Sequence, residues 1–124
     1  MAKASLRVYT AAEIQSRLVG ELRHWRLDGG VIRRVYRTHG WKGTLMAVNA
    51  IGHLAELAWH HPELRATYPS VEVRLDTHDA GGVTDRDFEL AARIEAVLQW
   101  RPSAGGALEG TPADPAHAYI VFDD

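Results

Sequence analysis

Two adjacent histidines and a third one further along the chain are the side chains best suited to chemistry in this sequence. His60 and His61 stand directly before Pro62, and His78 follows a strand-like run. Imidazole has the unperturbed pKa closest to neutrality, so it can give and take a proton near pH 7. Glu56 precedes His60 by four positions, and residues four apart share one face of a helix. We therefore expect Glu56 to orient His60 or to support its charge.

The helix that carries this histidine pair is predicted from Thr44 to His60, because apolar residues recur there at steps of three and four. Pro62 disfavours the α conformation at His61, so the helix should end there. The negative partial charge at a helix C-terminus favours a protonated imidazole by about 0.3–1 kcal/mol. A histidine at this place is suited to donate a proton.

A second polar run, Asp76-Thr77-His78-Asp79, closes a predicted strand ahead of two glycines. Strand ends beside glycine often present polar groups to a ligand. If this loop packs beside the end of the predicted helix, the three imidazoles converge on one cleft. Glu56, His60 and His78 could alternatively ligate a metal ion, since Glu and His four apart on a helix form a usable ligand spacing.

Each of these residues also has a purely structural interpretation. A histidine at a helix end beside proline often caps the helix or is solvated, and Glu56 can be a surface charge. Asp87 fits the first turn of a helix that opens at Thr84, where a carboxylate stabilises the helix dipole. Trp59 can be a core or rim aromatic rather than a ligand platform. Residue patterns alone predict an α+β domain in which a histidine cleft is one hypothesis.

The remaining elements are predicted from capping and alternation. A capping box at Thr10 and Glu13 opens a helix expected over residues 11–23. A hairpin turn at Asp28-Gly29-Gly30 leads into a return strand over residues 31–37. Charge occurs on both faces of that return strand, so we expect neither face to be fully buried, as near a sheet edge or a subunit contact.

A half-buried strand over residues 71–77 and a helix from Thr84 complete the pattern. The order is helix, two strands, helix, one or more strands, helix. This order predicts an α+β fold with helices laid on an antiparallel sheet. We expect one domain over residues 1–99 and a Gly/Pro-rich extension over residues 100–124, whose run from Ala118 to Phe122 could add a short strand to a sheet edge.

Composition excludes several functions. The 124 residues include no cysteine, which removes disulfides, thiolate catalysis and cysteine-based zinc sites. The formal net charge is −2, with both signs scattered, so nothing indicates direct nucleic acid binding. No apolar run approaches the roughly 20 residues of a membrane-spanning helix. We expect a cytoplasmic protein without a membrane segment.

The spacing of the polar residues resembles the signature of the pterin-4a-carbinolamine dehydratase family. That signature is Glu56-x(3)-His60-His61-Pro62-x(5)-Tyr68-x(9)-His78-x(8)-Asp87, with no spacing violated. The similarity covers about residues 10–98. It implies a four-stranded antiparallel sheet with helices on one face, and a homodimer or homotetramer.

The resemblance also implies an activity, the dehydration of 4a-hydroxytetrahydrobiopterin to quinonoid dihydropterin, with no cofactor and no metal. The catalytic residues it implies are His60, His61 and His78, with Glu56 and Asp87 in support. The residues it implies as pterin contacts are Trp59, Pro62, Asp76, Thr77 and Asp79. Among the histidines we expect His60 to be the acid/base residue, His78 its partner across the pterin, and His61 an orienting residue.

Some positions depart from the family pattern. Trp59 replaces a small acidic or polar residue, Thr38 and Leu45 replace phenylalanines, and Leu64 replaces an aromatic residue. We expect these changes to reshape the pocket. The family also includes non-catalytic members, a dimerisation cofactor of a transcription factor and a RuBisCO assembly factor, so a protein-binding role is the alternative to catalysis.

Overall fold

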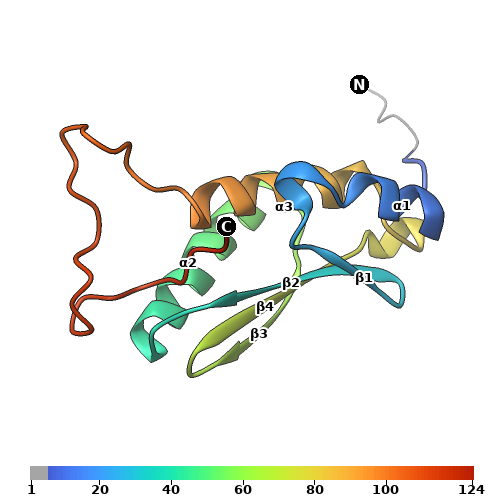
Figure 1. The fold of residues 1–124 in the computed structure, drawn as a ribbon. Helices are drawn as coiled ribbons and strands as arrows, with labels where there is room; N and C mark the ends of the chain where they lie inside the picture. Colours follow the sequence, from blue (N-terminus) through green and yellow to red (C-terminus); the bar gives the residue numbers. More distant parts are fainter. Residues whose placement is uncertain (1–5) are drawn as a thin grey trace.

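Four strands form one antiparallel sheet in the order β1-β2-β4-β3, and the helices lie across one of its faces (Figure 1). The structure is a computed structural model that describes residues 6–124; residues 1–5 of the predicted domain lie outside the described part. The α+β prediction is confirmed. The elements in chain order are α1 (Ala11–Arg17), the 3-10 turn η1 (Gly20–Leu22), β1 (Arg26–Asp28), β2 (Val31–Arg37), α2 (Trp41–Ala58), β3 (Glu63–Thr67), β4 (Ser70–Leu75), the 3-10 turn η2 (His78–Ala80) and α3 (Asp85–Leu98).

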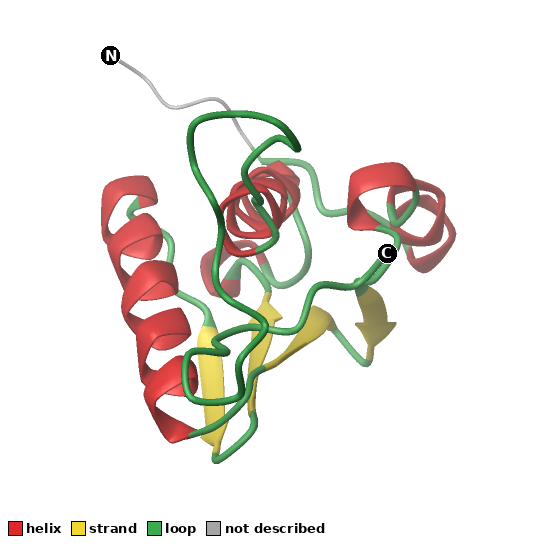
Figure 2. Cartoon of the chain, turned by 60° about the vertical axis from the view of Figure 1, so that its left-hand side comes forward, coloured by secondary structure: helices red, strands yellow, loops and turns green. Residues whose placement is uncertain are grey.

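The two faces of the sheet differ in chemistry because successive strand residues point to opposite sides. On the helix-covered face the side chains are buried; they include Ile32, Tyr36, Val71, Val73 and Leu75. On the open face charged side chains of neighbouring strands pair with one another, as Arg33 does with Glu72 at 3.3 Å. Figure 2 shows the helices gathered on one side of the strands.

The first predicted helix is shorter than expected. Its capping box at Thr10 and Glu13 is present, but α1 ends at Arg17, and the chain continues through η1 instead of reaching Arg23 as a helix. Leu18 leaves the helical conformation with ψ 56°, and Gly20 adopts φ 57°, a left-handed conformation, so no continuous helix reaches Arg23. Leu18 and Leu22 are nevertheless buried, because the 3-10 turn returns the chain to the core.

The second predicted helix differs at both ends. α2 begins at Trp41 and ends at Ala58, before His60. Trp59 caps it in a left-handed conformation, φ 50° and ψ 47°, and its N–H donates to the carbonyls of the last turn. His60 and His61 therefore lie just beyond the helix. Among the residues that the structure describes, no helix has the length and apolar character required to cross a bilayer.

β3 is the strand that residue patterns did not predict by themselves. It pairs antiparallel with β4, and it forms the outer edge of the sheet. Only Leu64 in this strand is partly buried, while its neighbours are exposed. An edge strand with so little burial lacks the alternating pattern that marks a strand in sequence.

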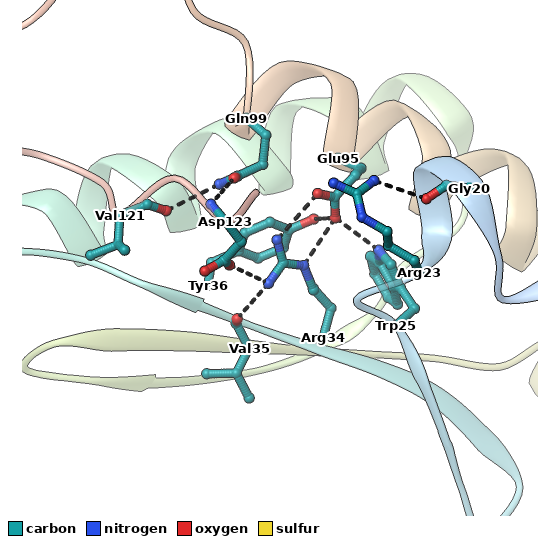
Figure 3. Close-up of polar contacts among 10 residues, drawn as sticks. All are labelled: Gly20, Arg23, Trp25, Arg34, Val35, Tyr36, Glu95, Gln99, Val121 and Asp123. Atoms are coloured by element: carbon teal, nitrogen blue, oxygen red, sulfur yellow. Dashed lines mark hydrogen bonds and ion pairs between the residues drawn. The ribbon is translucent and has the colours of Figure 1, made fainter.

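The expectation that neither face of the strand over residues 31–37, β2, is fully buried is wrong. β2 lies between β1 and β4, and Arg34, only 4% exposed, points into the helix-covered face. Its guanidinium donates to Glu95 of α3 at 3.0 Å and to Asp123 of the C-terminal segment at 2.7 Å (Figure 3). The Tyr36 hydroxyl also donates to Glu95, at 2.8 Å, and its burial raises the pKa of that hydroxyl above the usual value. Two carboxylates thus neutralise a charge that sequence reasoning placed at a sheet edge.

The C-terminal segment, residues 99–124, loops away from α3 and returns to the end of β2 (Figure 1). Ile120 forms a single bridge with Thr38, and the Val121 N–H donates to the Arg37 carbonyl at 2.9 Å. The side chain of Gln99 accepts from the Asp123 N–H at 2.8 Å. The apolar run ending at Phe122 therefore meets the sheet through an isolated bridge and not through a regular strand.

Candidate active site

His60 pairs with a buried carboxylate. Its Nε2 lies 2.6 Å from Oδ1 of Asp87, which stands in the first turn of α3 and is fully buried. The side chain of His60 is 11% exposed. The prediction that Glu56 supports His60 is wrong. Because the chain leaves the helix at Trp59, His60 turns toward α3 instead of remaining on the helix face of Glu56.

The other carboxylate oxygen of Asp87, Oδ2, accepts two hydrogen bonds. The Thr77 hydroxyl donates to Oδ2 at 2.8 Å, and the Thr84 N–H donates to the same oxygen at 2.9 Å. The second contact belongs to the capping box predicted at Thr84 and Asp87, which is present. One carboxylate therefore joins the start of α3, the end of α2 and the residue directly before His78.

His61 has its own carboxylate partner. Its Nε2 lies 2.7 Å from Oε1 of Glu56, in a pair whose side chains are 51% and 68% exposed. The indole of Trp59 packs edge to face against the His61 ring, with 5.0 Å between the ring centroids. Trp59 is itself 74% exposed, so it is a surface aromatic and not a core residue.

The loop that carries His78 is closed by main-chain contacts. The Thr77 N–H donates to the Gly82 carbonyl at 2.8 Å, and Gly81 adopts a left-handed conformation that reverses the chain. His78 and Asp79 are exposed, whereas Asp76 is partly buried. Since Thr77 contacts Asp87, this loop begins beside the His60–Asp87 pair.

An open groove of about 840 Å³ between α2 and α3 reaches His60 from the helix side. Leu54 and Leu57 of α2 and Leu90 of α3 give it apolar walls. His61 and His78 do not line this groove. The structure thus joins His60, Asp87 and Thr77 through hydrogen bonds, and joins His61, Glu56 and Trp59 in a second cluster.

The metal-site alternative requires Glu56 and His60 to face one ion, and Glu56 contacts His61 instead. Within residues 6–124, the His, Asp and Glu side chains form no group of three or more suited to holding a metal ion.

Each carboxylate partner favours one tautomer of its imidazole. A carboxylate can only accept hydrogen bonds, so a neutral ring beside it carries its proton on the facing nitrogen. In both His60 and His61 that nitrogen is Nε2. Nδ1 is then the nitrogen without a proton in the neutral ring.

The family model described as pterin 4 alpha carbinolamine dehydratase matches residues 7–97 of the chain. The chain belongs to the pterin-4a-carbinolamine dehydratase family. The resemblance read from the spacing of the histidines is confirmed. The match ends at residue 97, ahead of the C-terminal segment that supplies Asp123 to Arg34.

Alignments with individual members of the dehydratase family span most of the chain. A provisionally named pterin-4-alpha-carbinolamine dehydratase from Acidobacterium capsulatum is 44% identical over 89 residues, which are 72% of this chain and 96% of that protein. One with the same provisional name from Aquifex aeolicus is 42% identical over 78 residues, 63% of this chain and 79% of that protein. A solved structure from Brucella melitensis, described as a transcriptional coactivator/pterin dehydratase, superposes with a TM-score of 0.65 at 28% identity and covers 73% of this chain and 98% of that one.

The departures from the dehydratase family pattern fall in different parts of the molecule. Trp59 borders His61, and Leu64 is partly buried on β3. Thr38 and Leu45 lie at the other end of α2 from the histidines, and Thr38 is buried in contact with Thr44. An α-helix rises about 1.5 Å per residue, so most of the length of α2 separates these two residues from the histidine end. The expectation that these departures reshape the pocket or shift its substrate preference stays a prediction.

Sequence reasoning missed two relationships at the site. The first is the pairing of His60 with Asp87, which are separated by 27 positions in sequence. The second is the use of the Thr77 hydroxyl by Asp87. The capping box was visible in the sequence, but a capping carboxylate with a spare oxygen does not reveal which side chain will reach it.

Proposed function

We propose that the protein is a dehydratase that converts a 4a-hydroxytetrahydropterin, such as 4a-hydroxytetrahydrobiopterin, to quinonoid dihydropterin and water. Membership of the dehydratase family supports this reaction class. The single observation that carries the proposal is the pairing of each of the two adjacent imidazoles with a carboxylate, His60 with Asp87 and His61 with Glu56.

The reaction needs one proton delivered and one proton removed. The bond between C4a and the hydroxyl oxygen breaks, and the hydroxyl leaves as water after it receives a proton. A ring nitrogen of the pterin loses a proton, so the ring becomes the quinonoid dihydro form. No electrons pass to or from another molecule, so the reaction requires no redox cofactor. A positioned acid and a positioned base each contribute typically about 10²–10⁴-fold.

We assign the roles of the histidines from the family resemblance and from the contacts of His60 and His61. His60 is the acid/base residue, because a buried carboxylate fixes its ring and leaves Nδ1 to exchange the proton. His78 acts from across the pterin, on the loop that starts at Thr77. His61 orients the pterin, with its ring held by Glu56. Trp59, Pro62, Asp76 and Asp79 are the proposed pterin contacts.

The proposal also covers the oligomeric state, the location and the partners of the protein. We expect a homodimer or homotetramer in the cytoplasm, with the pterin as its small-molecule partner. A protein-binding role is the second candidate function, and two observations favour it. The structurally similar Brucella chain is described as a transcriptional coactivator as well as a dehydratase. The outer side of α2 also exposes large apolar side chains, among them Trp41, Leu45 and Met46.

A stopped-flow absorbance assay separates the two candidates. A 4a-hydroxytetrahydropterin is generated in the instrument, and its dehydration is followed with and without purified protein. Catalysis by the wild-type chain, and equally by the control variant His117→Ala in the exposed C-terminal loop, supports the dehydratase. A rate equal to spontaneous dehydration over a wide range of protein concentration would leave protein binding as the better proposal.

A further inference from the structure

We propose that Thr77 is a positioning residue for the dehydration and not a pterin contact: its hydroxyl orients Asp87, which fixes His60 in the tautomer protonated on Nε2. This inference rests on the proposed function and goes beyond it by reassigning Thr77. Its hydroxyl donates to Asp87 at 2.8 Å, and its N–H donates to Gly82 at 2.8 Å. Both of its donors are therefore engaged within the protein.

The directions of the hydrogen bonds follow from the number of protons available. Thr77 has one hydroxyl proton, and Asp87 takes it. The hydroxyl oxygens of Thr77 and Thr84 lie 2.7 Å apart, so the proton between them must come from Thr84. The Thr84 oxygen in turn accepts from the Arg86 N–H at 3.3 Å. The chain of donors therefore runs from Arg86 to Thr84, then to Thr77, then to Asp87.

The end of this chain determines the state of His60. Oδ2 of Asp87 accepts from Thr77 and from the Thr84 N–H, which leaves Oδ1 for His60. As a carboxylate, Asp87 has no proton to give, so the His60 ring must donate through Nε2. The neutral ring then presents an unprotonated Nδ1, the form that a general base needs.

Burial strengthens the hydrogen bonds of this network. Thr84 and Asp87 are fully buried, and Thr77 is 3% exposed. Hydrogen bonds in such surroundings are stronger than in water, and a lost partner is not replaced by solvent. Because the carboxylate cannot rotate without losing two donors, Thr77 holds Oδ1 toward His60.

The network also joins the acid/base residue to the loop of its proposed partner. Thr77 directly precedes His78, so the contact that aims Asp87 also anchors the start of that loop. The charged groups that face His60 across the groove are Glu21 of η1 and Arg86, Glu89 and Arg93 of α3. None of them changes when the hydroxyl of Thr77 is removed, so the effect of Thr77 can be measured separately.

The test combines ring 15N NMR with kinetics. In the wild-type protein, at a pH where the ring is neutral, the 15N shifts and couplings of His60 should show the proton on Nε2. Thr77→Val should let Asp87 turn away from His60 in part of the molecules, and in these the ring can adopt the other tautomer. The variant should also lower kcat about tenfold with KM unchanged, since one hydrogen bond to a charged group is lost. Thr77→Ser should restore both the wild-type tautomer and kcat. Thr67→Val, at an exposed threonine of β3, is the matched control and should change neither.

The outcomes separate this inference from the proposed function. A wild-type His60 protonated on Nδ1 would overturn the inference even if Thr77→Val fails to fold. An unchanged tautomer in a folded Thr77→Val protein would overturn it as well, and so would a rise in KM at constant kcat, because that pattern indicates a substrate contact. If the tautomer responds as expected while the wild-type protein has no dehydratase activity, the positioning role stands and the proposed function fails.

Discussion

The imidazole of His60 and the carboxylate of Asp87 lie 2.6 Å apart between Nε2 and Oδ1, and this contact ties the end of α2 to the first turn of α3. Asp87 therefore has two tasks. It caps α3 through its bond to the Thr84 N–H, and it orients the proposed acid/base residue. Its loss should affect both stability and activity, and the two effects can be measured independently.

The variant Asp87→Asn should lower kcat by about 100-fold or more, because the amide can present an N–H to His60 and favour the wrong tautomer. It should also reduce stability by about 1 kcal/mol through the weakened helix cap. Stopped-flow kinetics and urea unfolding report the two quantities. Asp85→Asn, in the same first turn but exposed, serves as the control and should keep kcat near the wild-type value. An Asp87→Asn protein with wild-type kcat would show that Asp87 does not orient the acid/base residue.

The pair of His61 and Glu56 should matter much less, because both side chains are largely exposed. Glu56→Gln should lower kcat by at most about fivefold, since solvent competes for the contact of an exposed pair. A loss as large as that of Asp87→Asn would instead assign Glu56 a direct part in the reaction. Kinetics of the two variants side by side make the comparison.

The C-terminal segment should contribute stability that depends on pH. Burial by itself would raise the pKa of the Asp123 carboxyl, but the hydrogen bond and charge of Arg34, aided by Arg37 and His24, hold it below its usual value. A carboxyl with a lowered pKa in the folded state stabilises the protein above its unfolded pKa of about 3.9, and this contribution is lost as pH falls through the folded pKa. Asp123→Asn should therefore cost about 1–2 kcal/mol at pH 7 and progressively less below about pH 4.

Urea unfolding of the wild-type protein and of Asp123→Asn across this pH range measures that difference. The matched control is Asp124→Asn, at a terminal residue that is 90% exposed in its side chain. A difference between wild type and Asp123→Asn that stays constant from pH 7 to pH 2 would contradict the ion pair with Arg34.

Alanine substitutions at two glycines of α2 test how the C-terminal segment packs against this helix. A Cβ on Gly43 would lie 2.8 Å from the Tyr119 carbonyl oxygen, whereas a Cβ on Gly52 would meet nothing within 4 Å. Gly43→Ala should destabilise the protein by about 1–3 kcal/mol, because backbone must move to admit the methyl group. Gly52→Ala should stabilise it by about 0.5–1 kcal/mol through higher helix propensity. Equal effects of the two substitutions on thermal unfolding would show that Tyr119 does not pack against α2.

Local signals in the sequence predicted much of the fold. The capping boxes at Thr10 and Thr84 fix where two helices begin, and both are present. The first helix ends where Leu18 leaves the helical conformation, and the second ends at the positive-φ residue Trp59, a residue type that gives no warning of such a conformation. β3 was missed because an exposed edge strand has no apolar alternation.

Long-range polar contacts were beyond the reach of local patterns. Arg34 meets Glu95 and Asp123 across 61 and 89 positions, and nothing near Arg34 in the sequence indicates that its charge will be neutralised in the interior. The same holds for His60. Its helical neighbour Glu56 was the partner that spacing favoured, but the left-handed turn at Trp59 rotates His60 toward Asp87.

The most direct test of the account is the dehydration rate of His60→Ala measured by stopped flow beside His61→Ala, His78→Ala and the control His117→Ala, each checked for a folded state by circular dichroism. The account predicts that His60→Ala loses about 10²–10⁴-fold in kcat, that the other two site variants are also impaired, and that His117→Ala matches the wild type. A folded His60→Ala protein that dehydrates the pterin at the wild-type rate would contradict it.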